Sequence, residues 1–447
     1  MDELRGRFRR LDRVSAPDLW HEAVERAAQV EVAPRPTFNP GLALIAIALL
    51  LAALAGAIVV GGWLNRQLPA PKVVTYDNGM IVAYAGCGRL VTLDPISLEV
   101  GDLVAGSPGC TVGETAFRPA WSSDGSRLAY LVPTRRDSST APGVTGVWLY
   151  DATTGEARQL DECPGDRCEM VDISPDGSLI AYVDAYVDGS GDWPASLVVV
   201  GVDSGETHSI HLAAPPGRGG PVFSPDGSQI ALPLVGGESG LYLVDVSGVK
   251  DGTMGSPTLL HGIVESADLA WSPDGAWIAY TQTGGLGLER DVWNGKNTDQ
   301  AVETEGTGIV VVSADGTESR VVATGPNGGN SAFPTWSADS ASVAYLAVSV
   351  ANPPISISND PPVPSKLTLW TVAIDGDEPT QIYESDCCYS GFAPPAWSPD
   401  GEWIALEVEV EDNAAESGVV LVRADGSEVR RMQGIPLEPV WQPIPEH

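Results

Sequence analysis

A short sequence pattern recurs six times in this chain and limits the folds that it can adopt. Each copy starts with an apolar residue and Ser, passes through Asp and usually Gly, and ends in an apolar run such as Ile-Ala-Tyr. The turn aspartates that mark the copies are Asp124, Asp176, Asp226, Asp274, Asp339 and Asp400. Successive aspartates are 52, 50, 48, 65 and 61 positions apart. Repeats of about 40–50 residues with short strands are typical of β-propellers.

Each copy predicts a β-hairpin. Pro presets φ for the turn, the Asp side chain bonds the local backbone, and Gly accepts the conformation at the exit. The bulky residue before the turn is expected to pack between neighbouring blades, and the Ile-Ala-Tyr run fits a strand buried on both faces. A second hairpin, whose turn also carries Asp, follows each copy. Two hairpins supply the four strands of one blade.

One further blade is split between the two ends of the repeat region. Residues 80–100 resemble the last three strands of a blade, and residues 437–443 resemble the missing innermost strand. We therefore predict an all-β, seven-bladed β-propeller over residues 79–447, closed by strand 437–443, with a linker and first strand region at 65–78. Six blades are the alternative, because only six turns carry the full pattern.

The Trp-Ser-Pro-Asp-Gly and Ile-Ala-Tyr repeats resemble those of the TolB-type, WD-like β-propeller family over about residues 74–447. The resemblance implies a propeller and leaves the function open, because relatives include envelope binding proteins and propeller modules attached to peptidases. Those peptidases keep their nucleophile in a separate hydrolase domain. The fifth copy departs from the pattern, with Ala338 and Ser340 in place of Pro and Gly, so its turn is the least well predicted.

Residues 41–64 contain no charged side chain and are rich in Leu, Ala, Ile and Val. As a helix this segment would be about 36 Å long, enough to cross a hydrocarbon layer of about 30 Å. It predicts a transmembrane helix rather than a cleaved signal peptide, because 40 residues precede it. Arginines cluster in residues 1–40, so the positive-inside rule places the N-terminus in the cytoplasm and the propeller outside the cell membrane of a bacterium.

The cytoplasmic stub, residues 1–40, has two stretches with apolar residues at helical spacing. Two amphipathic helices in residues 1–30 would either dock a cytoplasmic partner or lie on the inner leaflet. The stub resembles the short cytoplasmic ends of membrane-anchored regulators such as anti-sigma factors. It lacks the cysteine-histidine motif of zinc-type anti-sigma domains.

Acidic residues dominate the part of the chain expected outside the membrane. The whole chain has 25 basic and 59 acidic residues, and residues 1–40 hold seven of each, which leaves 18 basic and 52 acidic for the rest. This charge excludes nucleic-acid binding through bulk electrostatics. Many of these carboxylates are turn residues, and others keep the domain soluble.

Six cysteines are present, all after the predicted membrane segment, and the pattern places them in loops on one face of the propeller. An even number in an exported domain predicts disulfides. The preferred pairs are Cys87–Cys110, Cys163–Cys168 and Cys387–Cys388. No Cys-x-x-Cys spacing occurs and no His lies nearby in the sequence, so we predict no metal at these thiols.

The longest predicted loops share the cysteine-bearing face and carry acidic and aromatic residues. Long insertions on one face of a repeat protein often mark its binding face. The candidate binding residues there are Asp184, Asp188, Asp192, Trp193, Asp291, Trp293, Asp360, Glu411 and Asp412. Calcium is the one cofactor that such carboxylates would suit. Solvated insertions without a ligand are the competing interpretation.

The sequence has no His-Glu-x-x-His, no Gly-x-Ser-x-Gly and no Walker-type loop. We therefore predict no catalytic residues, and a non-catalytic scaffold or sensor that binds a protein, peptide or envelope polymer. One alternative is a transmembrane signalling regulator that acts through the N-terminal stub. Another is a propeller hydrolase or lyase that uses acidic residues on its face.

Overall fold

The computed structural model describes most of the predicted propeller and none of the chain before residue 76. The described residues are 76–85, 88–105, 119–133, 145–164, 168, 170–185, 194–217, 219–235, 239–262, 266–283, 307–324, 330–349, 366–375, 378–385, 393–408, 417–433 and 438–445. They belong to one compact unit, Val74–His447. The predicted stub (1–40) and transmembrane helix (41–64) lie outside them. Within the described ranges, no helix is both long and apolar enough to cross a membrane.

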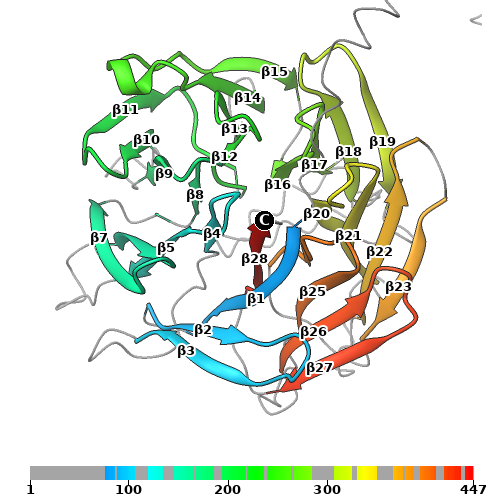
Figure 1. Ribbon diagram of the computed structural model, residues 1–447. Helices are drawn as coiled ribbons and strands as arrows, with labels where there is room; N and C mark the ends of the chain where they lie inside the picture. The colour runs from blue at the N-terminus through cyan, green and yellow to red at the C-terminus, as the bar shows by residue number, and fades with distance from the viewer. Residues whose placement is uncertain are drawn as a thin grey trace, which may run out of the picture. The chain divides into compact units, whose positions relative to one another are not determined.

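Seven four-stranded antiparallel sheets surround a central axis, as Figure 1 shows, which confirms seven blades and excludes six. Blades 1 to 3, each from the inside outward, are β28 (Val440–Pro445), β1 (Tyr76–Tyr84), β2 (Leu90–Leu93) and β3 (Val100–Val104); β4 (Ala120–Trp121), β5 (Arg127–Pro133), β6 (Thr145–Asp151) and β7 (Glu156–Cys163); and β8 (Val171–Ile173), β9 (Leu179–Ala185), β10 (Ala195–Gly201) and β11 (Thr207–Leu212). Blades 4 and 5 are β12 (Val222–Phe223), β13 (Gln229–Leu234), β14 (Gly240–Asp245) and β15 (Thr258–Gly262); and β16 (Ser266–Trp271), β17 (Trp277–Thr283), β18 (Thr307–Ser313) and β19 (Ser319–Thr324). Blades 6 and 7 are β20 (Asn330–Trp336), β21 (Ser342–Ser349), β22 (Lys366–Ala373) and β23 (Thr380–Glu384); and β24 (Ala396–Trp397), β25 (Trp403–Val408), β26 (Gly418–Arg423) and β27 (Val429–Gln433).

The two ends of the propeller meet in blade 1. Its innermost strand, β28, pairs antiparallel with β1, and Tyr76 lies opposite Pro445 in the register. This strand starts three residues later than the predicted range 437–443. Closure in this way pairs the first strand of the propeller with its last and leaves no gap in the ring.

The hydrophobic core lies between neighbouring blades. In blade 3, Ile180 and Ala181 are fully buried and Tyr182 nearly so, as expected for a strand covered on both faces. The cluster around Leu179 and Val249 fills the seam between blades 3 and 4, and similar clusters fill the other seams. Burial of these apolar side chains between sheets is the main force that holds the ring together.

The repeated turns are stabilised by their own side chains. In blade 3, the Oδ1 atom of Asp176 accepts hydrogen bonds from the Ser174 hydroxyl (2.7 Å) and the Ser178 backbone N–H (3.0 Å), and the Ser174 hydroxyl oxygen accepts one from the Leu179 N–H (2.9 Å). The same Ser-to-Asp contact of 2.6–2.7 Å occurs in all six repeats. Each turn carboxylate therefore accepts a hydrogen bond from a backbone N–H group for which a tight turn offers no backbone acceptor.

The fifth repeat keeps the turn without its glycine. Ser340 adopts a left-handed φ of 61° and donates its N–H to the Ser337 carbonyl at 2.9 Å. Its hydroxyl oxygen also accepts a hydrogen bond from the backbone N–H of Asp274, the turn residue of blade 5, at 3.0 Å. This contact between neighbouring blades offsets the strain of a left-handed serine.

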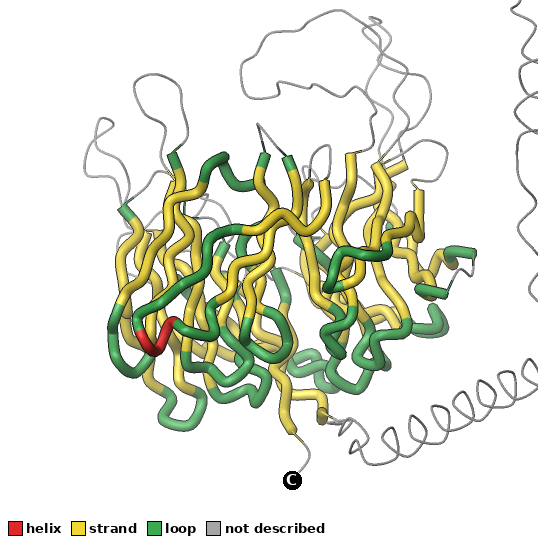
Figure 2. The backbone as a smooth tube through the Cα atoms, turned by 90° about the horizontal axis from the view of Figure 1, so that it is seen from above, coloured by secondary structure: helices red, strands yellow, loops and turns green. Residues whose placement is uncertain are grey.

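Alternation of antiparallel strands gives the disc two different faces. The turn face carries the tight turns between the first and second strands and those between the third and fourth strands of the blades. The loop face, at the opposite ends of the strands, carries the connections from the second to the third strand and from blade to blade. Figure 2 shows the described turns, including the short 3₁₀ helix η2 (Val249–Asp251) in red, gathered at one end of the strands. Tyr76, the first residue of β1, and Pro445, the last of β28, both lie on the turn face.

Candidate functional site

A disulfide on the loop face links blades 2 and 3. Cys163 is the last residue of β7, not a loop residue as the sequence predicted, and Cys168 lies just before β8. The two residues form a disulfide with a Cα–Cα distance of 6.3 Å, and both are almost fully buried. The bridge closes the connection between the blades and keeps its two ends together.

Asp184 is the one predicted binding residue that the structure describes. The sequence placed it in a loop, but β9 runs to Ala185 and Asp184 pairs with Ser196 of β10 in the sheet. Its Oδ1 atom lies 3.3 Å from Sγ of Cys163. A carboxylate therefore sits against the disulfide at the loop-face end of the seam between blades 2 and 3.

The ligand atoms of Cys163, Cys168 and Asp184 lie within 4.8 Å of one another. Two sulfurs and one carboxylate suit zinc better than calcium, which prefers an all-oxygen shell. The disulfide withholds both thiolates, so this set cannot bind zinc through its sulfurs while the bridge is closed. The arrangement fits a structural bridge, and the calcium expectation has no carboxylate cluster to support it here.

The other predicted residues of this face lie outside the described part of the chain. They are the binding candidates Asp188, Asp192, Trp193, Asp291, Trp293, Asp360, Glu411 and Asp412, and the cysteines Cys87, Cys110, Cys387 and Cys388. The structure therefore brings together one binding candidate and one predicted cysteine pair.

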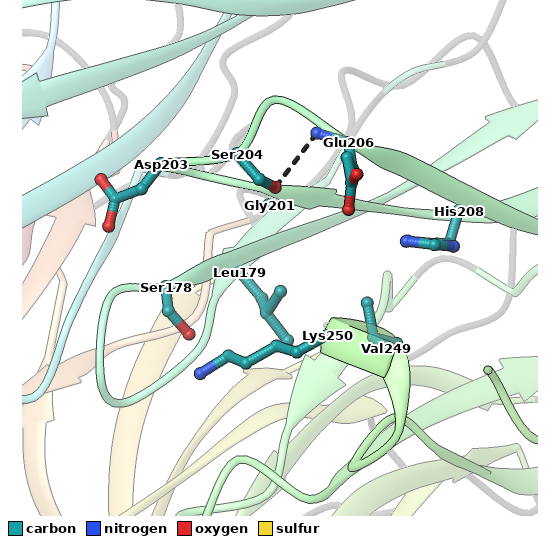
Figure 3. Close-up of a pocket in the computed structure, with 9 residues that line it drawn as sticks. All are labelled: Ser178, Leu179, Gly201, Asp203, Ser204, Glu206, His208, Val249 and Lys250. Carbon is teal, nitrogen blue, oxygen red and sulfur yellow. Dashed lines mark hydrogen bonds between the residues drawn. The ribbon is translucent and has the colours of Figure 1, made fainter. Parts of the chain in front are cut away.

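A cavity that the sequence did not predict lies on the turn face, between blades 3 and 4. Its volume is about 250 Å³. Figure 3 shows the residues that line it: Ser178, Leu179, Gly201, Asp203, Ser204, Glu206, His208, Val249 and Lys250. The first seven belong to blade 3, and the last two belong to η2 of blade 4. The signal in the sequence was the span from Asp245 to Thr258, the longest connection between a third and a fourth strand.

The helix η2 fixes this cavity by packing and by charge. Val249 is 2% exposed and belongs to the apolar cluster of blade 3 and blade 4, and Gly252 ends the turn with a left-handed φ of 81°. Lys250 Nζ lies 3.3 Å from Oδ2 of Asp176 in the neighbouring blade. Burial opposes ionisation of Asp176, but its hydrogen bonds to Ser174, Ser178 and Lys250 outweigh that effect and hold its pKa well below the usual range.

No family model matches the sequence. Among curated proteins, the uncharacterized peptidase YuxL of Bacillus subtilis (strain 168) is 31% identical over 124 residues. The match covers 27% of this chain and only 17% of that relative. The chain therefore shares a short stretch with the peptidase and spans a small part of its length.

Solved structures of several propeller proteins are similar in fold. The periplasmic gluconolactonase PpgL of Pseudomonas aeruginosa has a TM-score of 0.52 and 14% identity, with 83% of this chain and 97% of that chain covered. An oligogalacturonate lyase in complex with manganese has a TM-score of 0.50 and 17% identity, with 80% and 84% covered. TolB of Acinetobacter baumannii has a TM-score of 0.45 and 13% identity, with 81% and 66% covered.

The class of protein is thus a seven-bladed β-propeller. Proteins of similar fold include a gluconolactonase and a lyase. Fold alone does not choose between catalysis and binding, because function depends on the residues of a site.

Proposed function

We propose that this protein is a non-catalytic, membrane-anchored propeller of the bacterial envelope that binds a protein, peptide or envelope polymer on its loop face. The observation that carries this proposal is the position of Tyr76 on the turn face. The chain that precedes Tyr76, with the predicted membrane helix, joins the propeller there. The loop face, at the opposite ends of the strands, carries neither Tyr76 nor Pro445, and we take it as the binding face.

The chemistry of the two faces supports the same choice of binding face. On the turn face, the turn aspartates are occupied by hydrogen bonds to Ser and backbone N–H groups within their own turns. On the loop face, the Cys163–Cys168 bridge fixes one of the connections that join the blades. A rigid ring with fixed connections is suited to recognition by loops.

Site-specific photocrosslinking in native cells tests the binding face. A photoreactive residue replaces Glu162, which is exposed near the loop-face end of β7. The matched control replaces Thr154, which is exposed on the turn face of the same blade. We expect a reproducible macromolecular partner from position 162 and none from position 154. Capture from position 154 alone would show that the turn face is the binding face.

The signalling alternative needs its own measurement, because residues 1–40 lie outside the described structure. A photoreactive residue at Trp20 would capture a cytoplasmic regulator if the stub transmits a signal. Capture of lipid alone would reduce the stub to part of the anchor.

A further inference from the structure

We propose that the cavity between blades 3 and 4 binds a small zwitterion with an aliphatic side chain, such as a free amino acid. This site lies on the turn face and is separate from the loop-face binding proposed above. The charged groups, the apolar floor and the volume of the cavity all favour this class of ligand.

A carboxylate and an amine both line the cavity. Figure 3 shows the Glu206 carboxylate and the His208 imidazole directed inward from the β10–β11 hairpin of blade 3, and the Lys250 side chain extending from η2 so that its amine lies near Ser178. Glu206 and Lys250 are both described, and no ion pair joins them; the Lys250 amine instead lies 3.3 Å from Oδ2 of Asp176. A ligand that carries an ammonium group and a carboxylate would meet both groups at once, with the ammonium at Glu206 and the carboxylate at Lys250, whose amine it would share with Asp176.

The other lining residues select the rest of the ligand. Leu179 and Val249 are 6% and 2% exposed and give the cavity an apolar floor. The Ser178 hydroxyl already donates to Asp176 at 2.7 Å, so its oxygen remains as an acceptor. A cavity of about 250 Å³ is smaller than the usual 300–1,000 Å³ of drug-sized sites, which favours a ligand of amino-acid size.

The helix η2 distinguishes this seam from the seam between blades 2 and 3. Glu156 of blade 2 occupies the same repeat position as Glu206, directly after the turn glycine. The neighbouring turn of blade 3, between β10 and β11, is short and has no counterpart of η2. Packing of Val249 explains why η2 is stable. Packing alone does not explain why Lys250 follows Val249 or why Glu206 lines the same cavity.

Calorimetric titration of the purified full-length protein with L-leucine tests the proposal. We expect one binding site for L-leucine. Glu206→Gln and Lys250→Met should each weaken binding about fivefold, the effect of about 1 kcal/mol for a solvent-accessible ion pair. N-acetyl-L-leucine amide keeps the side chain but lacks both charges, so it should bind at least about tenfold more weakly if each lost ion pair contributes this much.

The control is Glu156→Gln, which removes the carboxylate at the same repeat position of blade 2, where the next blade has no counterpart of η2, and should leave binding unchanged. Circular dichroism checks that every variant is folded. Absence of binding by L-leucine would overturn the proposal. Equal binding of the blocked amide would show that the two charges of the ligand are not recognised. Binding that is unchanged by Glu206→Gln and Lys250→Met would show that L-leucine does not bind in this cavity.

Discussion

The indole Nε1 of Trp441 donates a hydrogen bond of 3.0 Å to the backbone carbonyl oxygen of Ala396, across the seam between blade 1 and blade 7. Trp336 and Trp271 make the same contact to the innermost strand of the blade before them, at 2.9 and 3.3 Å. The repeated tryptophan therefore joins blades through hydrogen bonds as well as through packing. At Trp441 the contact spans the seam where the last blade meets the first.

Trp441→Phe should destabilise the propeller, because it leaves the Ala396 carbonyl without its indole donor. The matched control is Trp397→Phe at the same repeat position, where Nε1 is buried and has no hydrogen-bond partner among the described residues. Both changes remove similar aromatic volume, so their difference isolates the hydrogen bond. In urea denaturation, we expect Trp441→Phe to cost about 1 kcal/mol more unfolding free energy than the control. Equal costs would mean that the hydrogen bond contributes nothing.

Gly125→Ala should disrupt the contact between the blade 2 turn and the closing strand. Gly125 has a φ of +66°, and a Cβ there would lie 1.8 Å from the Pro443 carbonyl oxygen. Gly155 has a similar φ of +72° with nothing within 4 Å, so Gly155→Ala reports the backbone strain alone. We expect Gly125→Ala to lower the unfolding free energy by about 1–3 kcal/mol more than Gly155→Ala. Similar losses of unfolding free energy in the two variants would mean that backbone strain accounts for the whole effect.

The turn at Asp315 should make stability depend on acid pH. Hydrogen bonds from the Ser313 hydroxyl and from Thr317 lower the pKa of Asp315 to about 2, whereas an unfolded Asp titrates near about 3.9. Because the folded pKa is the lower one, the stabilisation is complete above about pH 4 and is lost as the pH falls toward about 2. Urea midpoints of the native chain and Asp315→Asn should differ at pH 7 and converge near pH 2. A constant difference across this range would contradict the assignment.

Asp184→Asn should make the Cys163–Cys168 disulfide easier to reduce. The carboxylate lies 3.3 Å from Sγ of Cys163, where it repels an attacking thiolate and disfavours a thiolate on Cys163. Removal of this charge should speed reduction by a dithiol several-fold, as measured by alkylation and mass spectrometry. Because unfolding would also expose the bridge, the variant is compared at a denaturant concentration where both proteins remain folded. An unchanged rate would assign the protection to burial alone.

The blade count could be predicted because turn chemistry is local. Ser174, Asp176 and Gly177 lie within four positions, so their roles in the turn are visible in the sequence. The same turn forms at Ser340, where the sequence breaks the pattern, because a contact to Asp274 of another blade compensates. Such a contact between residues far apart in the chain leaves no periodic signal.

The cavity could not be predicted for a related reason. Its wall is η2, a helix of three residues, which is too short to show helical periodicity. Lys250 and Glu206 line one cavity only because blades 3 and 4 pack side by side. Asp184 was misplaced in a loop because a carboxylate is unusual in a buried blade, and its strand position depends on pairing with Ser196.

The pairing of β28 with β1 also determines when this protein can finish folding. During synthesis β1 emerges early, while its partner is among the last parts of the propeller to be made. Until then, one edge of β1 offers unpaired backbone groups to any passing strand. A chain that ends before Val440 therefore forms an open ring. The unpaired edge of β1 then makes this chain prone to aggregation and to proteolysis. The final strand thus acts as a check that every blade of the propeller has been synthesised.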